Sequence, residues 1–236
     1  MFITAPGPAL FSELPHDASE DTARLKAFVS RLALCPVSEN VCNQYSYDSH
    51  GSDVRRENLL LYLRQMLALR PDIMLIGEAP GYKGCRLTGV PFTSEAIAMN
   101  GVETHGLFGT ARGYRRTGET AAAMKEQTAT IMWQAISRLP TPPLLWNAYP
   151  FHPFKQANPR SNRRPTLAEL RVGAGFLGEL LGLFQVREVV AVGNVAEAAA
   201  AEINIRCLKI RHPANGGKRA FNEGISRLYL LGTTPS

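Results

Sequence analysis

The stretch IMLIGEAPG, residues 73–81, decides how the rest of the chain is read. Four apolar residues are followed at once by a Gly-Glu-Ala-Pro-Gly turn. A short apolar run bounded by glycine and proline is typical of a buried strand. The stretch therefore predicts a strand that brings a polar turn, with the carboxylate of Glu78, to one edge of a sheet.

Three more apolar runs look like strands, and helical patterns separate them. The runs are residues 143–147 (PLLWN), 188–193 (EVVAVG) and 205–210 (IRCLKI). Helical spacing of apolar residues covers residues 18–34, 55–70, 118–139, 166–184 and 194–202. Thr166 with Glu169, and Asn194 with Glu197, have the spacing of a capping box at a helix start. This alternation predicts an α/β fold with a central four-stranded, mainly parallel sheet flanked by helices on both faces.

Length and composition indicate one globular domain. The chain has 236 residues, of which 45% are hydrophobic and 19% charged. We expect a single domain over residues 1–236, with a motif-bearing core at about 71–232 and an N-terminal helical part at about 17–70. No apolar run approaches the roughly 18 residues of a membrane span, and the first twenty residues lack the pattern of a signal peptide. We expect a cytoplasmic monomer that does not contact a membrane.

The positive charge is concentrated in loops. The formal net charge is +6, and basic residues gather at 111–116, 155–165 and 206–219, which are rich in glycine, proline or asparagine. Cations on loops can follow a phosphate backbone, so nucleic acid is an expected partner. A solvated basic surface is the alternative explanation.

The cysteines do not have the spacing of a metal site. Cys35, Cys42, Cys85 and Cys207 form no C-x2-C pair, whereas iron–sulfur and zinc sites usually take two ligands from one tight turn. We expect reduced thiols and neither a metal nor another cofactor.

Each predicted strand ends in polar or turn-forming residues. The strands are followed by GEAPGYKG, by Asn147 with AYPFHP, by Gly193 with Asn194, and by RHPANGGKR. In a parallel α/β sheet the ligand lies beyond the carboxyl ends of the strands. These ends therefore predict one specific pocket.

Three of these segments resemble the active-site motifs of a known family. GEAPG with GVPF (residues 77–81 and 89–92), WNAYP (146–150) and RHPANGG (211–217) are similar, in order and position, to the three motifs of the uracil-DNA glycosylase superfamily. The resemblance covers roughly residues 73–221 and is closest to the iron–sulfur branch. The cluster cysteines of that branch are missing, because only Cys35 stands where part of its N-terminal pair would be.

The resemblance implies roles for the pocket residues. Phe92 would stack under a flipped pyrimidine, and the amide of Asn147 would pair with N3–H and O4 of uracil. His212 would be catalytic, stabilising the leaving base at O2. Glu78 would be a second catalytic and base-pocket residue, positioning water or stabilising the sugar cation. A second histidine, His152, follows the wrong strand for catalysis and is interpreted as structural or DNA-facing.

Three more residues line the predicted uracil pocket. Ala79 stands where other branches have an aspartate, as it does in the iron–sulfur branch. Gly81 stands where some branches have a bulky tyrosine that excludes thymine. Thymine exclusion must then come from elsewhere, and Tyr82 is the candidate.

A basic surface around the pocket is expected to hold DNA. Lys83 and Arg86 make the loop after GEAPG basic, which predicts tight retention of the abasic product. By resemblance, residues 213–217 would lie near the minor groove. The candidate DNA-binding residues are Lys83, Arg86, Arg163, Arg164, Pro213, Asn215, Lys218 and Arg219.

The sequence therefore predicts a uracil-DNA glycosylase. It would hydrolyse the N-glycosidic bond of flipped-out deoxyuridine in single- or double-stranded DNA and leave an abasic site, the first step of base excision repair. Two alternatives stay open: a glycosylase for another deaminated base such as hypoxanthine or xanthine, and a non-catalytic protein that binds DNA damage or abasic sites. A nucleotide-binding α/β enzyme is a remoter possibility, because the chain lacks G-x-G-x-x-G and the P-loop lysine pattern.

Overall fold

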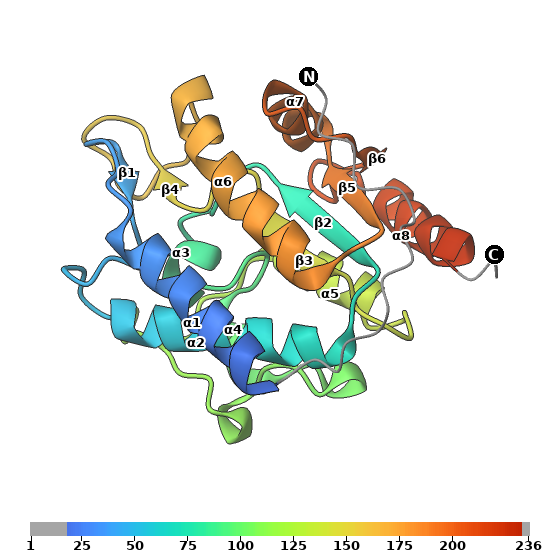
Figure 1. Cartoon of the computed structure of the whole chain (residues 1–236), viewed down its shortest axis with the longest axis horizontal. Coiled ribbons are helices and arrows are strands. Elements are labelled where there is room, and N and C mark those ends of the chain that lie inside the picture. The colour runs from blue at the N-terminus through green and yellow to red at the C-terminus, as the bar shows by residue number, and fades with distance from the viewer. Residues whose placement is uncertain (1–17, 233–236) are drawn as a thin grey trace.

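A four-stranded parallel sheet forms the centre of the computed structural model, which describes residues 18–232 (Figure 1). The strand order is β3-β2-β5-β6, and every neighbouring pair is parallel. The strands are β2 (Ile73–Gly77), β3 (Leu144–Asn147), β5 (Glu188–Val192) and β6 (Leu208–Ile210). The predicted α/β fold class is thus confirmed.

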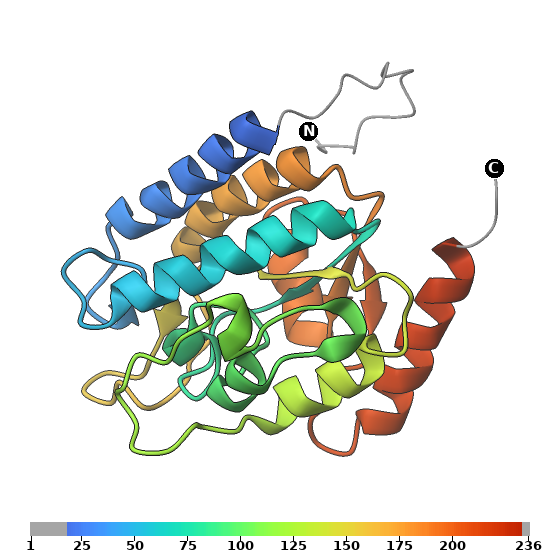
Figure 2. The same ribbon diagram turned by 90° about the horizontal axis from the view of Figure 1, so that it is seen from below.

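Helices cover both faces of this sheet. Helices α6 and α7 contact each other and lie on one face of the sheet. Helices α5 and α8 contact each other and lie on the opposite face (Figures 1 and 2). No helix within residues 18–232 is long and apolar enough to span a membrane. The helices are α1 (Ala18–Leu34), α2 (Ser52–Leu69), α3 (Cys85–Thr88), α4 (Glu95–Asn100), α5 (Gln127–Ile136), α6 (Leu167–Phe184), α7 (Asn194–Glu202) and α8 (Lys218–Gly232), with short 3-10 turns η1 (Glu103–His105) and η2 (Thr110–Arg112).

Aromatic contacts and one hydrogen bond attach the N-terminal helices to the edge strand β3. Phe28 of α1 packs against Trp146 of β3 and Phe176 of α6, with ring centroids 5.6 and 6.0 Å away. Helices α1 and α6 lie side by side in both views (Figures 1 and 2). The amide N–H of Leu145 donates to the hydroxyl of Tyr62 on α2 at 2.8 Å. This bond satisfies a donor that an edge strand would leave unpaired.

A second, two-stranded sheet joins the N-terminal segment to the region after β3. Strand β1 (Val41–Cys42) pairs antiparallel with β4 (His152–Pro153). The segment before α2 is therefore tied to the loop that follows Asn147.

Two predictions of local structure were wrong. The helix expected at residues 118–139 is only α5. The side chain of Glu95 accepts the amide N–H of Met124 at 3.0 Å, which holds the preceding segment in a non-helical conformation. Asn194 does not cap α7. Gly193, at φ +89°, occupies the cap position, and Asn194 is the first helical residue. The capping box of Thr166 and Glu169 on α6 is confirmed. The first twenty residues, which lack the sequence pattern of a signal peptide, lie mostly outside the described residues.

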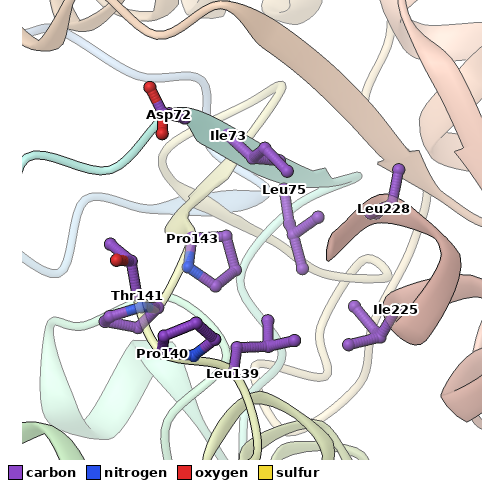
Figure 3. A pocket seen from close by; sticks show the side chains of 10 residues that line it. Asp72, Ile73, Leu75, Leu139, Pro140, Thr141, Pro143, Ile225 and Leu228 are labelled. Atoms are coloured by element: carbon purple, nitrogen blue, oxygen red, sulfur yellow. The ribbon is translucent and has the colours of Figure 1, made fainter. Parts of the chain in front are cut away.

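An apolar cavity of about 250 Å³ lies at the amino-terminal edge of the sheet (Figure 3). Its walls are the start of β2, the proline-rich segment before β3, and Ile225 and Leu228 of α8. The polar motifs follow the carboxyl ends of the strands, at the opposite edge. This cavity is therefore not the predicted pocket.

The packing of α6 on the sheet makes a prediction about two glycines of that helix. A Cβ on Gly173 would lie 1.9 Å from the carbonyl oxygen of Ala148, whereas one on Gly178 would meet nothing within 4 Å. Gly173→Ala should lower the free energy of unfolding by about 1–3 kcal/mol through overpacking. Gly178→Ala should raise it by about 0.5–1 kcal/mol through helix propensity. Urea unfolding of both variants tests this, and equal effects would contradict the close contact.

Candidate active site at the carboxyl ends of the strands

The missing side chain of Gly77 allows two site residues to meet. Gly77 ends β2 and is paired with Asn147, which ends β3. A Cβ on Gly77 would lie 2.4 Å from Cζ of Phe92 and 2.7 Å from Oδ1 of Asn147. Any side chain here would push the ring and the amide away. The structure thus brings together two of the residues predicted for base binding.

Phe92 is held in a strained backbone conformation. Its φ of +51° lies in the left-handed region, which bulky residues rarely adopt. Its carbonyl oxygen accepts the indole N–H of Trp133, on α5, at 3.1 Å. Next to it, the hydroxyl of Thr88 lies within 3.3 Å of the carbonyl oxygen of Thr93. Backbone strain of this kind often marks functional sites. Here the strained conformation places the half-buried ring of Phe92 over Gly77.

Asn147 offers an amide that is open to a ligand. The residue is 4% exposed, and within residues 18–232 its side chain makes no hydrogen bond. Its amide oxygen and nitrogen are not among the fully buried, unpaired side-chain atoms of these residues, so both still reach open space at the site. A ligand that offers one donor and one acceptor would satisfy both ends of the amide.

His212 has one ring nitrogen engaged and one available. The amide N–H of Ala214 donates to Nδ1 at 3.1 Å, so a neutral ring carries its proton on Nε2. Burial is the main effect that lowers the pKa of His212, while the charge of Glu126 opposes it. The ring lies against Gly193 at the end of β5, where an added Cβ would approach the histidine Cβ to 2.9 Å. The site thus holds a neutral imidazole with a free N–H donor.

Glu78 supplies the carboxylate of the first motif. The residue is half-buried, and its side chain makes no hydrogen bond within the described part of the chain. Burial raises the pKa of Glu78, and the nearby charge of Arg164 acts in the opposite direction. Arg164 is exposed and therefore lies at the mouth of the site rather than inside it.

The other predicted base-pocket residues lie in the same turn. Ala79 is half-buried and packs against the core. A Cβ on Gly81 would meet only Nδ2 of Asn162, at 4.0 Å, so the space beside this glycine is open. The amide N–H of Tyr82 donates to Oδ1 of Asn162 at 3.1 Å. The turn is therefore fixed against the loop that follows β4.

Two basic residues prove to be structural anchors. His152 is fully buried, and its ring nitrogens lie 2.8 and 3.2 Å from the carbonyl oxygens of Pro80 and Pro159. Arg163 binds both carboxylate oxygens of Glu169 at 2.7 Å, and its other donors contact backbone carbonyls. Contact of Arg163 with DNA stays a prediction, but its guanidinium already has a full set of partners.

The remaining DNA-contact candidates lie around the third motif and the first-motif loop. Asn215 is exposed at φ +52°, whereas Pro213 is buried. Lys218 and Arg219 are exposed at the start of α8, where Arg219 pairs with Glu223 one turn later. Lys83 is exposed, and Arg86 donates to Glu119 at 3.0 Å. Their contacts with DNA remain predictions.

The absence of an iron–sulfur cluster stays a prediction, and the surroundings of the cysteines bear on it. Within residues 18–232, no group of three histidine, cysteine or acidic side chains is arranged to hold a metal. Cys85 is buried beside the hydroxyl of Tyr45, and burial raises the pKa of its thiol to about 12. Cluster ligands are thiolates, which this environment disfavours.

Comparison with known proteins identifies the family. The model of the uracil DNA glycosylase superfamily matches residues 65–228, more than half of the chain. The chain belongs to the uracil DNA glycosylase superfamily. It is therefore a DNA glycosylase by family, and family membership leaves its target base open. No curated protein matches the chain significantly.

A solved structure agrees in fold. The crystal structure of wild-type SMUG2 from Pedobacter heparinus is similar, with a TM-score of 0.58 and 12% sequence identity. The match covers 91% of this chain and 99% of that chain. At this identity the likeness supports the fold alone.

Sequence reasoning missed the residues that hold this glycosylase site in shape. Trp133 fixes Phe92, Glu95 fixes the segment before α5, and Glu119 pairs with Arg86. None of them belongs to a motif, and their partners are remote in sequence. Arg160 lies in the basic stretch 155–165 and in none of the motifs.

The contact over Gly77 can be tested with a matched pair of glycine variants. Gly77→Ala should displace Phe92 and Asn147 and lower glycosylase kcat/KM about 10²-fold, the size expected for an ångström of misplacement. Gly81→Ala should stay active, because its Cβ would enter open space. Thermal melting checks that both variants fold. Equal activity of the two would contradict the contact.

The protonation states of the site predict the dependence of glycosylase activity on pH. Protonating Nδ1 of His212 would break its bond with Ala214, and protonating Glu78 would remove its charge. The active forms are neutral His212 and ionised Glu78, and a rising pH favours both. The pKa of His212 lies below its ordinary value of 6.5, and the pKa of Glu78 lies above its ordinary value of 4.5. The kcat/KM of wild type should therefore fall on acidification, and Glu78→Gln should leave a single titration step below pH 6.5, that of His212. An acid limb above pH 6.5 that persists in Glu78→Gln would contradict the assignment of His212.

Proposed function

We propose that the protein is a uracil-DNA glycosylase, which removes uracil from a flipped-out deoxyuridine and leaves an abasic site. The observation that carries the proposal is the amide of Asn147, which lies beside Phe92 and makes no hydrogen bond within residues 18–232. Uracil offers N3–H and O4 on one edge, and one amide satisfies both. Cytosine reverses both groups, and each mismatch leaves a buried polar atom unsatisfied at a cost of about 1–3 kcal/mol.

The other site residues account for the reaction. The ring of Phe92 supports the flipped base by stacking. Nε2–H of His212 donates to O2 as the base leaves with negative charge, a type of interaction worth about 3–4 kcal/mol in the transition state. Glu78 stabilises the developing sugar cation or orients the attacking water. The proposal requires one chain, DNA as substrate and no cofactor.

The open space at Gly81 favours a second candidate substrate. Hypoxanthine presents N1–H and O6 in the same donor and acceptor order as uracil, so Asn147 accepts both bases. A Cβ on Gly81 would meet only Asn162, at 4.0 Å, and this space suits a larger base. Xanthine follows the same argument, whereas adenine presents the wrong donor pattern to the amide.

An excision assay tests the proposal. Wild type, His212→Ala and Asn147→Ala are incubated with oligonucleotides that carry one uracil, hypoxanthine, xanthine or cytosine, and abasic sites are cleaved with alkali. Wild type should act on uracil, and His212→Ala should lose about 10²–10³-fold in rate. A fast first turnover followed by slow release would fit the predicted retention of the abasic product.

The outcomes separate the candidate functions. Excision of hypoxanthine without uracil would replace the primary proposal with the second candidate. Binding of damaged DNA without excision of any base would leave a damage-binding protein. Unchanged excision by Asn147→Ala would contradict the role of the amide.

A further inference from the structure

A second cavity, of about 630 Å³, lies next to the first-motif turn. Its walls come from the loop after β2, from residues 119–124 and from residues 159–160. Tyr82 belongs both to this wall and to the turn that contains Glu78 and Gly81. The cavity is thus a neighbour of the base pocket, and the residues assigned to catalysis do not line it.

The cavity carries an excess of positive charge. Three cations line it, Lys83, Arg86 and Arg160, against one carboxylate, Glu119. Glu119 also pairs with Arg55, which is buried behind it, so this single carboxylate faces two guanidinium groups. Besides burial, the charge of Arg160 lowers the pKa of Arg86, which reflects repulsion between the two groups. An anion in the cavity would relieve that repulsion.

Two of the three cations have free donors. Across the described part of the chain, the guanidinium of Arg160 and the ammonium of Lys83 make no hydrogen bond or ion pair. Nζ of Lys83 lies 5.5 Å from the ring centroid of Tyr82. Arg86, in contrast, is oriented by Glu119 and by the carbonyl oxygen of Tyr82 at 3.3 Å. The cavity therefore combines one fixed cation with two that are available to a ligand.

Buried groups fix the wall formed by residues 119–124. Glu95, which is 1% exposed, accepts from the hydroxyl of Thr120 at 2.7 Å and from the amide of Met124 at 3.0 Å. Arg116 donates to the carbonyl oxygen of Thr120 at 2.6 Å. A cavity whose wall is fixed before binding loses little entropy when it takes a ligand.

The opposite wall is fixed as well. His152 bridges the carbonyl oxygens of Pro80 and Pro159, and Asn162 holds the amide of Tyr82. These contacts join the first-motif turn to the loop that carries Arg160. The backbone segments that carry Arg160 and Lys83 are thereby held together by the fold.

We propose that this cavity binds a phosphodiester group of the DNA strand that lies next to the flipped nucleotide. Arg160 and Lys83 supply free donors, Arg86 supplies an oriented charge, and Tyr82 separates the phosphate from the base pocket. This inference rests on the proposed function, since it assigns the substrate strand to a cavity beside that site. It names Arg160 as a substrate-binding residue in addition to the motif residues.

A scan with neutral linkages tests the proposal. Single-stranded oligonucleotides with one uracil carry a methylphosphonate at one linkage at a time, and KM and the single-turnover excision rate at saturation are measured for each. For wild type, one linkage near the uracil should raise KM about tenfold when neutral, as expected for a lost charge-assisted hydrogen bond, with the single-turnover excision rate unchanged. Arg160→Ala should raise KM about tenfold for the unmodified strand and remove the effect of that linkage. Arg138→Ala, an exposed arginine beyond the far end of α5, is the matched control.

A binding measurement separates failure of this inference from failure of the proposed function. Fluorescence anisotropy of a labelled, uracil-free single strand is recorded with the same three proteins. Weaker DNA binding by Arg160→Ala than by Arg138→Ala supports phosphate binding in the cavity even if no uracil is excised. Two results together would overturn phosphate binding in the cavity: uracil excision in which no neutral linkage changes KM, and equal DNA binding by the two variants. The glycosylase proposal would then still stand.

Discussion

The close approach over Gly77 is the constraint on which the site depends. β2 and β3 end side by side, and only a residue without a side chain lets the ring of Phe92 and the amide of Asn147 meet above that point. Phe92 keeps its left-handed backbone there because Trp133 holds its carbonyl oxygen. Neighbouring parts of the protein thus support one small contact, which places a stacking surface beside a hydrogen-bonding amide.

Much of the fold could be predicted from local patterns. Apolar runs between helical segments predicted the parallel sheet, and Thr166 with Glu169 predicted the start of α6, because these signals lie within a few residues. The region before α5 could not be predicted in this way. Residues 121–123 are alanines with high helix propensity, but the carboxylate of Glu95, distant in sequence, captures the amide of Met124. A tertiary hydrogen bond outweighed local propensity.

The candidate site, like the fold, could be predicted only where the signal is local in the sequence. The motifs place Asn147 at the end of β3 and His212 just after β6, since strand ends can be recognised in the sequence, whereas Phe92 lies in a turn after α3 that returns to Gly77. The sequence did not show that Arg163 would be engaged by a carboxylate and by backbone carbonyls. Nor did it reveal the cavity beside the first-motif turn, because the charges there come from three loops that only the fold brings together. Motif residues are predictable, whereas the residues that position them depend on remote partners.

The central claim is that the unpaired amide of Asn147 is the recognition group for the base. The most direct measurement is the NMR signal of its side-chain NH2, assigned with Asn147→Ala, during titration with free uracil and then with free cytosine. The account predicts that uracil shifts this signal and that cytosine does not, because only uracil matches the donor and acceptor of the amide. Equal shifts with the two bases, or none with uracil, would contradict it.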